Sequence, residues 1–176
     1  MKCRAMVILI LLSTVALIAC AQSPTPARTL APETQARDVW TDPSTGLMWA
    51  ARDNGKDVSW KGAVKYCRKL RLAGYSDWGL ATLSELEGIY DKNANAPGLA
   101  RLGGPAKGSD FTWHVKGNLF LTGDEWSNNY RVDDRGHFSG YVWYFDFNEG
   151  RPDNDPTGWP YPFNNRHALC VRGPEK

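Results

Sequence analysis

The 176-residue sequence predicts an α+β domain. Two amphipathic helical patterns occur early, over residues 60–72 and after Thr82, and an aromatic run with a period of two, residues 141–148, occurs late. Two other stretches, 93–108 and 149–165, have the composition of loops. We therefore expect two helices near the N-terminal side, packed on a small and mostly antiparallel sheet with long loops.

A β-hairpin is expected at the start of the domain. Val39-Trp40 and Leu47-Met48-Trp49 flank residues 42–46, in which Pro43 sets one turn residue and Gly46 tolerates a positive φ.

Each helix has a start signal. Ser59 can cap the first helix, whose apolar residues share one face: Trp60, Ala63, Val64, Cys67 and Leu70. Thr82 and Glu85 have the spacing of a capping box, which opens the second helix. Its inward residues are expected to be Leu86, Ile89 and Tyr90.

The late strand has two alternating sets of side chains. The set Tyr141, Trp143, Phe145 and Phe147 is expected to face the core, with the intervening side chains on the other face. A short final strand is expected over residues 168–172.

Residues 1–19 have the pattern of an export signal. Lys2 and Arg4 precede an apolar run over 5–19, which is shorter than the roughly 20 residues of a membrane span. The run ends in the string LIAC, which is typical of a lipobox and makes Cys20 the lipidated N-terminus. An ordinary signal peptide with a chance cysteine is the alternative. Ala21 is not acidic, which favours the outer membrane, with its periplasmic or surface face left open.

The segment 20–37 is expected to be a flexible, lipidated tether, because it holds three prolines and almost no large apolar residue. A single domain follows over 38–176. Lys and Arg total 21 and Asp and Glu 19, and the signal contains two of the cations, so the exported chain is neutral. That balance argues against a nucleic-acid partner.

Two of the four cysteines remain for the domain. Cys3 leaves with the signal and Cys20 carries lipid, while Cys67 lies on the core face of the first helix and Cys170 in the last strand. Export permits oxidation, so we expect a Cys67–Cys170 disulfide, with two separate buried thiols as the alternative.

The chain resembles one family in the order and spacing of several strings, which are DPSTGLMW (42–49), VSW (58–60), LAGYSDW (72–78), WS (126–127), WYFDF (143–147) and CVR (170–172). This is the Lcl C-terminal domain family, named for a bacterial collagen-like adhesin and long treated as a domain of unknown function. The resemblance covers about residues 39–173.

The resemblance implies a C-type-lectin-like fold, in which a disulfide commonly ties the first helix to the final strand. It also implies binding of sulfated polysaccharides such as glycosaminoglycans, and with it adhesion. The family pattern Trp-Arg-Leu-Pro-Thr reads Trp78-Gly79-Leu80-Ala81-Thr82 here. The changes at Gly79 and Ala81 leave open any ligand contact or rigid turn that Arg and Pro supply in relatives.

The first candidate ligand surface is the polar face of the first helix. It carries four cations on adjacent turns, Lys61, Lys65, Arg68 and Lys69, which could meet a linear polyanion. A merely solvated helix face is the alternative.

The second candidate set lies in or beside expected loops. Trp113, Trp126, Trp159 and Tyr161 could stack on sugars, and a further group of residues could bond hydroxyls or hold Ca²⁺ through oxygen atoms: Asn128, Asn129, Asp153, Asn154 and Asp155. Core packing of the tryptophans and turn chemistry at 153–156 are the alternatives. No other cofactor is expected.

The sequence therefore favours a membrane-anchored, extracytoplasmic lipoprotein of the cell envelope with a non-catalytic carbohydrate-binding domain. A structural or protein-interaction envelope lipoprotein is the alternative. An enzyme is not expected, because His114, His137 and His167 are scattered and no GxSxG motif occurs.

Overall fold

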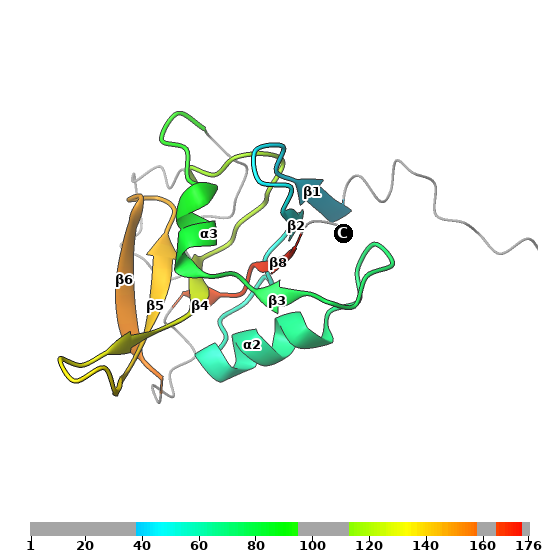
Figure 1. Cartoon of the computed structure of the whole chain (residues 1–176). Coiled ribbons are helices and arrows are strands. Elements are labelled where there is room, and N and C mark those ends of the chain that lie inside the picture. The colour runs from blue at the N-terminus through cyan, green and yellow to red at the C-terminus, as the bar shows by residue number, and fades with distance from the viewer. Residues whose placement is uncertain (1–37, 95–112, 158–164, 174–176) are drawn as a thin grey trace, which may run out of the picture.

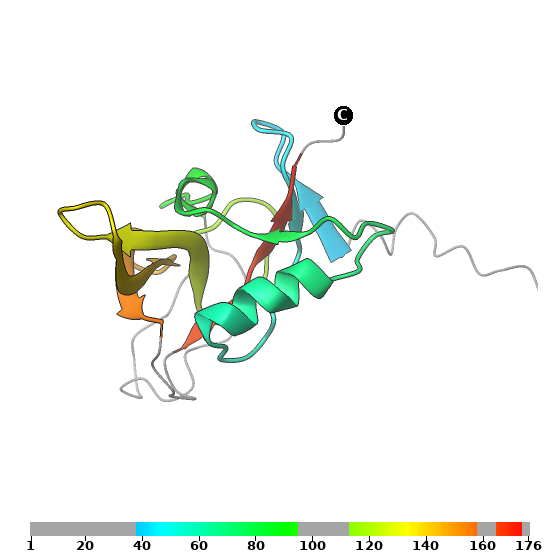
Figure 2. The ribbon, with the colours of Figure 1, turned by 60° about the horizontal axis from the view of Figure 1, so that its bottom comes forward.

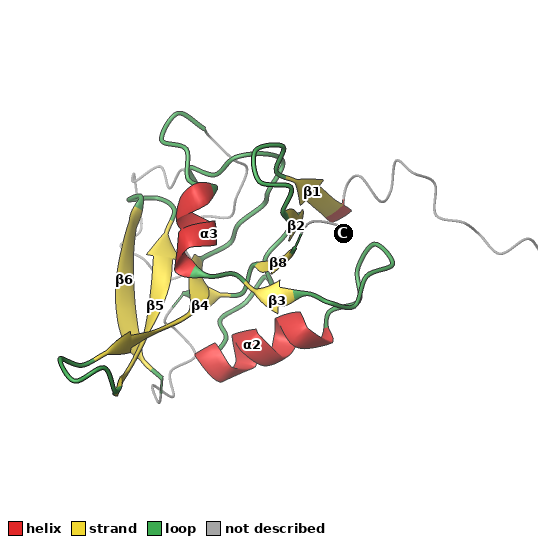
Figure 3. Ribbon diagram, in the orientation of Figure 1, coloured by secondary structure: helices red, strands yellow, loops and turns green. Residues whose placement is uncertain are grey.

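The computed structural model describes residues 38–94, 113–157 and 165–173. In these residues two helices accompany two four-stranded sheets (Figures 1 and 3). The predicted α+β class is therefore confirmed, but the expected single small sheet is wrong.

The first sheet joins the two ends of the domain. Its strand order is β1 (Val39–Thr41), β2 (Met48–Ala50), β8 (Cys170–Arg172) and β3 (Gly79–Leu80), and all neighbours are antiparallel. The predicted N-terminal hairpin is the β1–β2 pair, and the predicted final strand is β8, which lies between β2 and β3.

The second sheet is built mainly from the β4–β5–β6 meander. Its order is β6 (Arg151–Pro156), β5 (Phe138–Asp146), β4 (Asp124–Val132) and β7 (Arg166–His167), and only the β4–β7 pair is parallel. The β4–β5 hairpin projects from the rest of the head in both views (Figures 1 and 2).

The predicted loop over 149–165 is wrong, because part of it forms β6. The sequence of β6, RPDNDP, is unusual for a strand. The sheet tolerates this sequence because β6 is an edge strand among the described residues. At an edge a proline can lack its N–H donor without loss of a hydrogen bond to a neighbouring strand, and charged residues discourage pairing with other chains.

Both helices begin where their caps predict. In α2 (Trp60–Lys69) the Ser59 hydroxyl accepts from Gly62 N at 3.2 Å. In α3 (Leu83–Gly88) the Thr82 and Glu85 capping box is complete. Helix α2 ends three residues before the predicted Leu72, which instead pairs with Tyr75 in a turn.

Two buried clusters form the core. One lies around Trp49, Leu86, Ile89, Phe145 and Phe147, and the other around Ala63, Cys67, Trp126, Val142 and Tyr144. Strand β5 contributes to both, so the prediction that only one of its faces is buried is wrong. Tyr141, expected inside, is 39% exposed.

None of the described helices is both long enough and apolar enough to cross a membrane.

Candidate functional site

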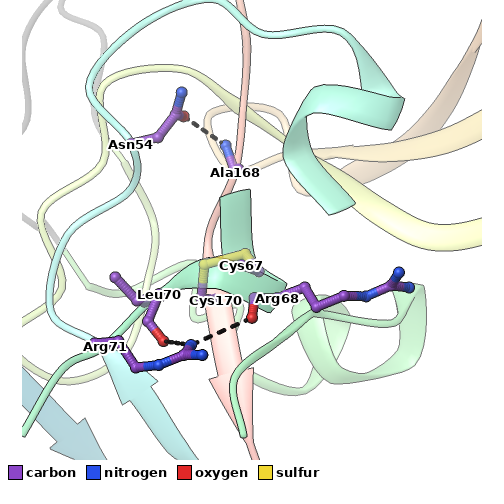
Figure 4. The surroundings of a disulfide bond; sticks show 7 residues. All are labelled: Asn54, Cys67, Arg68, Leu70, Arg71, Ala168 and Cys170. Atoms are coloured by element: carbon purple, nitrogen blue, oxygen red, sulfur yellow. Dashed lines mark hydrogen bonds between the residues drawn. A yellow bond between two sulfur atoms is a disulfide. The ribbon is translucent and has the colours of Figure 1, made fainter. Parts of the chain in front are cut away.

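A disulfide fixes α2 to the first sheet. Cys67 in α2 and Cys170 in β8 are bonded, with Cα atoms 5.3 Å apart and a sequence separation of 103 (Figure 4). The predicted pairing is confirmed. In the chain-entropy model a crosslink that closes about 100 residues contributes roughly 4.7 kcal/mol to stability. The bond also fixes the direction in which the outer face of α2 points.

The outer face of α2 carries the four predicted cations, and all four are exposed: Lys61, Lys65, Arg68 and Lys69. The first turn contains no acidic residue. Within the described residues, none of the four forms an ion pair. From Lys61 to Lys69 the charges extend over about 12 Å of helix axis.

Arg71 extends this surface and was missed by the sequence reasoning. It is exposed, and its Nη1 donates to the carbonyl oxygen of Leu70 at 2.9 Å and to that of Arg68 at 3.4 Å (Figure 4). These bonds hold the guanidinium at the C-terminal end of α2, where free carbonyls attract a cation. We call the five residues Lys61, Lys65, Arg68, Lys69 and Arg71 the cationic face.

A pocket of about 230 Å³ adjoins α2. It is lined by Asp38, Ala50, Arg52, Asp53, Tyr66, Leu70 and Leu72. Burial, followed by the negative charges of Asp53 and Glu125, raises the pKa of Tyr66, so this phenol remains protonated at neutral pH.

Trp126 follows the core-packing alternative and does not lie in a loop. It lies within β4, is 2% exposed, and its Nε1 donates to the Val58 carbonyl at 2.8 Å. Trp113 is also buried. Both rings belong to the core and offer no free face to a sugar. Trp159 and Tyr161 lie outside the described residues.

Asn128 and Asn129 are exposed as a ligand site requires, but they differ in their hydrogen bonds. The Asn129 Oδ1 accepts from Leu83 N at 2.7 Å, so this side chain holds the start of α3. The backbone of Asn128 donates to the Ala81 carbonyl at 2.6 Å, while its side chain faces outward.

The run Asp153-Asn154-Asp155 lies in β6 and not in a turn. Side chains alternate along a strand, so Asn154 points away from the face that the two carboxylates share. Asp155 pairs with Arg166 at 3.0 Å, and Asp153 Oδ2 lies 3.7 Å from Arg151 Nη1. This geometry gives no support to Ca²⁺ binding by the three residues together. No group of three or more His, Cys, Asp or Glu side chains in the described segments is arranged to hold a metal ion.

Arg166 anchors the second sheet. Its guanidinium pairs with Asp124 and Asp155 and lies 3.4 Å from the centroid of the Tyr144 ring. No spacing pattern in the sequence predicts this contact, because Arg166 is more than ten residues from each partner.

A buried polar network was also missed. His167 is placed between two carboxylates: Nδ1 lies 3.2 Å from Asp53 Oδ2 and Nε2 lies 3.4 Å from Asp57 Oδ1. The Thr122 hydroxyl donates to Asp53 at 2.8 Å. Burial alone would raise the pKa of Asp53, but the hydrogen bonds from His167 and Thr122 outweigh it, so the pKa lies below its ordinary value.

Glu125 lies beside this network with no hydrogen bond to either carboxyl oxygen. Burial, followed by the negative charges of Asp53 and Asp124, raises its pKa well above the usual range. The fold therefore favours the protonated form of Glu125 over the charged one.

The other histidines lie apart from this network. His114 bonds the Ala94 carbonyl through Nδ1 at 2.8 Å, and His137 is exposed near Asp133.

A second exposed surface lies on the projecting β4–β5 hairpin. Tyr130 is 55% exposed, Val132 48% and Phe138 52%. The exposed fractions of these apolar side chains are the largest among the exposed large hydrophobic residues of the described segments.

A family model matches most of the chain. No curated protein matches the chain. The model of the Lcl C-terminal domain matches residues 38–172, well over half of the chain. That span begins at β1 and ends at Arg172 of β8, so it takes in both sheets, both helices and the disulfide. The chain therefore belongs to the Lcl C-terminal domain family.

Proposed function

We propose that the chain is a membrane-anchored, extracytoplasmic lipoprotein whose head is a non-catalytic binding module for glycans, with sulfated polysaccharides as the preferred class. The observation that carries the proposal is the cationic face. Four exposed cations lie on one side of a helix that is bonded to the sheet behind it, and the exposed Arg71 lies just beyond the C-terminal end of that helix.

Among the described residues no acid pairs with the cationic face, which supports an anionic ligand. A sulfate group that approaches Lys65 or Arg68 displaces no carboxylate of the described residues, so its attraction is not offset by a broken ion pair. Arginine adds two parallel N–H donors that match the oxygens of an oxyanion. Because these charges are exposed, binding should weaken as salt is added.

The anchor is proposed at Cys20, with residues 21–37 as the tether. Seventeen residues span at most about 60 Å when extended, which lets the head stand clear of the lipid surface. Metabolic labelling with an alkyne fatty acid tests this: the wild type should be labelled and Cys20→Ser should not. Equal labelling of both would end the proposal of an anchor there. An outer-membrane location is proposed on the same sequence pattern, and density-gradient separation of membranes checks it.

We also propose a C-type-lectin-like fold for the head. Family membership and a disulfide from the first helix to the last strand support this. Superposition of both sheets on lectin-like domains is the check, and a different strand order would contradict it.

Retention on heparin resin tests the function. The detergent-solubilised full chain should be retained at low salt, and Lys65→Glu/Arg68→Glu should elute earlier in a salt gradient. Lys56→Glu/Lys92→Glu is the matched control, because it makes the same charge change at exposed lysines outside α2. An equal loss of heparin retention in both double variants would show that retention depends on net charge alone and not on the cationic face. Salt-resistant co-purification with an envelope protein, without heparin retention, would favour the protein-interaction alternative.

A further inference from the structure

We propose that the projecting end of the β4–β5 hairpin is a second carbohydrate site, which stacks on an uncharged, β-linked N-acetylhexosamine chain. The inference rests on the proposed glycan-binding function but uses a surface separate from the cationic face. We call Tyr130, Val132 and Phe138 the aromatic face.

The strand register brings the aromatic face together. Val132 pairs with Phe138, so their side chains lie on the same side of the hairpin. The ring centroids of Tyr130 and Phe138 are 5.6 Å apart and the rings meet at 82°, an edge-to-face pair in which each residue remains about half exposed. Tyr130 pairs with Val142 and Trp126 with Tyr144, so the aromatic face continues a side of the sheet whose inner part is core.

The hairpin end is already ordered by its own hydrogen bonds. The Ser139 hydroxyl donates to the Arg131 carbonyl at 2.9 Å. Asp133 Oδ1 accepts from the backbone N–H groups of Arg135 and His137, at 2.9 and 2.8 Å. A surface held in this way loses little conformational entropy when it binds a ligand.

The size of the aromatic face selects a small ligand. Two aromatic side chains and a valine, each about half exposed, offer roughly 300 Å². A stable complex with a protein, including a second copy of this chain, buries about 800 Å² on each partner. Two or three sugar rings need no more surface than the aromatic face provides.

The charges around the aromatic face exclude two other occupants. Asp133, Asp134 and Arg135 form the turn beyond the rings, so a bilayer could reach the rings only after burying these exposed charges. The two acids are balanced by Arg131 and Arg135, so no single-sign field attracts a polyanion.

An uncharged sugar chain fits the aromatic face better than a protein, a bilayer or a polyanion does. A β-linked pyranose presents a flat face of C–H groups, which packs on an open aromatic ring, and its hydroxyls can bond the Tyr130 phenol. Val132 lies beside the rings and offers an apolar contact to an acetamido methyl group, which selects the N-acetylated sugar.

Titration calorimetry of the full chain with chitohexaose tests the site. The wild type should bind, and Tyr130→Ala/Phe138→Ala should bind at least about tenfold more weakly. Tyr141→Ala is the matched control, because this half-exposed tyrosine lies on β5 but pairs with Pro156 on the opposite side of the sheet. It should bind as the wild type does.

Several outcomes would overturn the inference. The first is that the wild type does not bind chitohexaose, and the second is that Tyr130→Ala/Phe138→Ala binds it as tightly as the wild type does. The third is that the wild type binds cellohexaose, which lacks acetamido groups, as tightly as chitohexaose. Two further measurements separate the two surfaces. Tyr130→Ala/Phe138→Ala should still be retained on heparin resin, and Lys65→Glu/Arg68→Glu should still bind chitohexaose. Failure of the heparin experiment alone would leave the chitohexaose result unaffected.

Discussion

His167 and Asp53 are joined inside the head, with Nδ1 and Oδ2 3.2 Å apart. The contact ties β7 to the loop after β2, and on the other side of the ring Nε2 lies 3.4 Å from Asp57. In the parallel β4–β7 pair His167 is opposite Glu125, a buried acid whose pKa is raised. Because the fold shifts the pKa values of Asp53 and Glu125, the stability of the head depends on pH.

The substitution Glu125→Gln should change the pH dependence of stability. Burial raises the pKa of Glu125 above its ordinary value of 4.5, so the fold favours the protonated form. The stability from this group is complete below pH 4.5 and is lost as pH rises toward the folded pKa, by at most about 1.4 kcal/mol per pH unit. Glutamine does not titrate, so urea unfolding between pH 5 and 8 should show a smaller decline. A variant with the wild-type decline would contradict this.

Removal of the disulfide by Cys67→Ala/Cys170→Ala should lower the free energy of unfolding by about 2–5 kcal/mol, because the unfolded chain regains the entropy of a long open loop. Urea unfolding measures the loss, and chemical reduction of the wild type should reproduce it. A loss below about 1 kcal/mol would show that packing alone holds α2 on β8.

Gly150→Ala should destabilise the head more than Gly140→Ala. Both residues have a positive φ, of 69° and 88°, so both substitutions strain the backbone by about 1 kcal/mol. A Cβ at Gly140 meets nothing within 4 Å, whereas one at Gly150 would lie 2.2 Å from Tyr90 Cζ, a ring that packs on Phe145. The additional overpacking should cost about 1–3 kcal/mol. Thermal unfolding compares the two, and equal shifts would contradict the contact.

Trp126→Ala should lower the free energy of unfolding much more than Tyr130→Ala, although both residues lie in β4. Loss of the buried indole and of its bond to Val58 should cost about 3–5 kcal/mol. Loss of the exposed Tyr130 ring should change stability by less than about 1 kcal/mol. Chemical denaturation checks both, and a stable Trp126→Ala protein would contradict the burial of this residue.

The elements that the sequence predicted correctly are those with local signals. Ser59 and the Thr82–Glu85 box fix helix starts through bonds within four residues, and Gly46 closes the first hairpin. The pairing of Cys67 with Cys170 followed from helix periodicity and a count of the available cysteines. The cationic face also follows from helix periodicity, since one side of α2 is buried.

The features that the sequence missed depend on distant partners. Among the described strands β6 pairs with β5 alone, and nothing in RPDNDP signals that partner. The prediction for β5 assumed that one face of the strand is exposed to solvent. In the structure the neighbouring residues Tyr144 and Phe145, which point to opposite faces, are both buried in the core. The Arg166 and His167 contacts bring together residues 11 to 114 positions apart. No pattern of period two or 3.6 reports such pairs.

The affinity of the full chain for a heparin decasaccharide, measured against salt concentration, tests the role of the cationic face most directly. The account predicts binding that weakens with salt in the wild type and in Lys56→Glu/Lys92→Glu. It predicts at least about tenfold weaker binding at low salt in Lys65→Glu/Arg68→Glu. Wild-type affinity in that last variant, with its fold intact, would contradict the assignment of α2 as the binding surface.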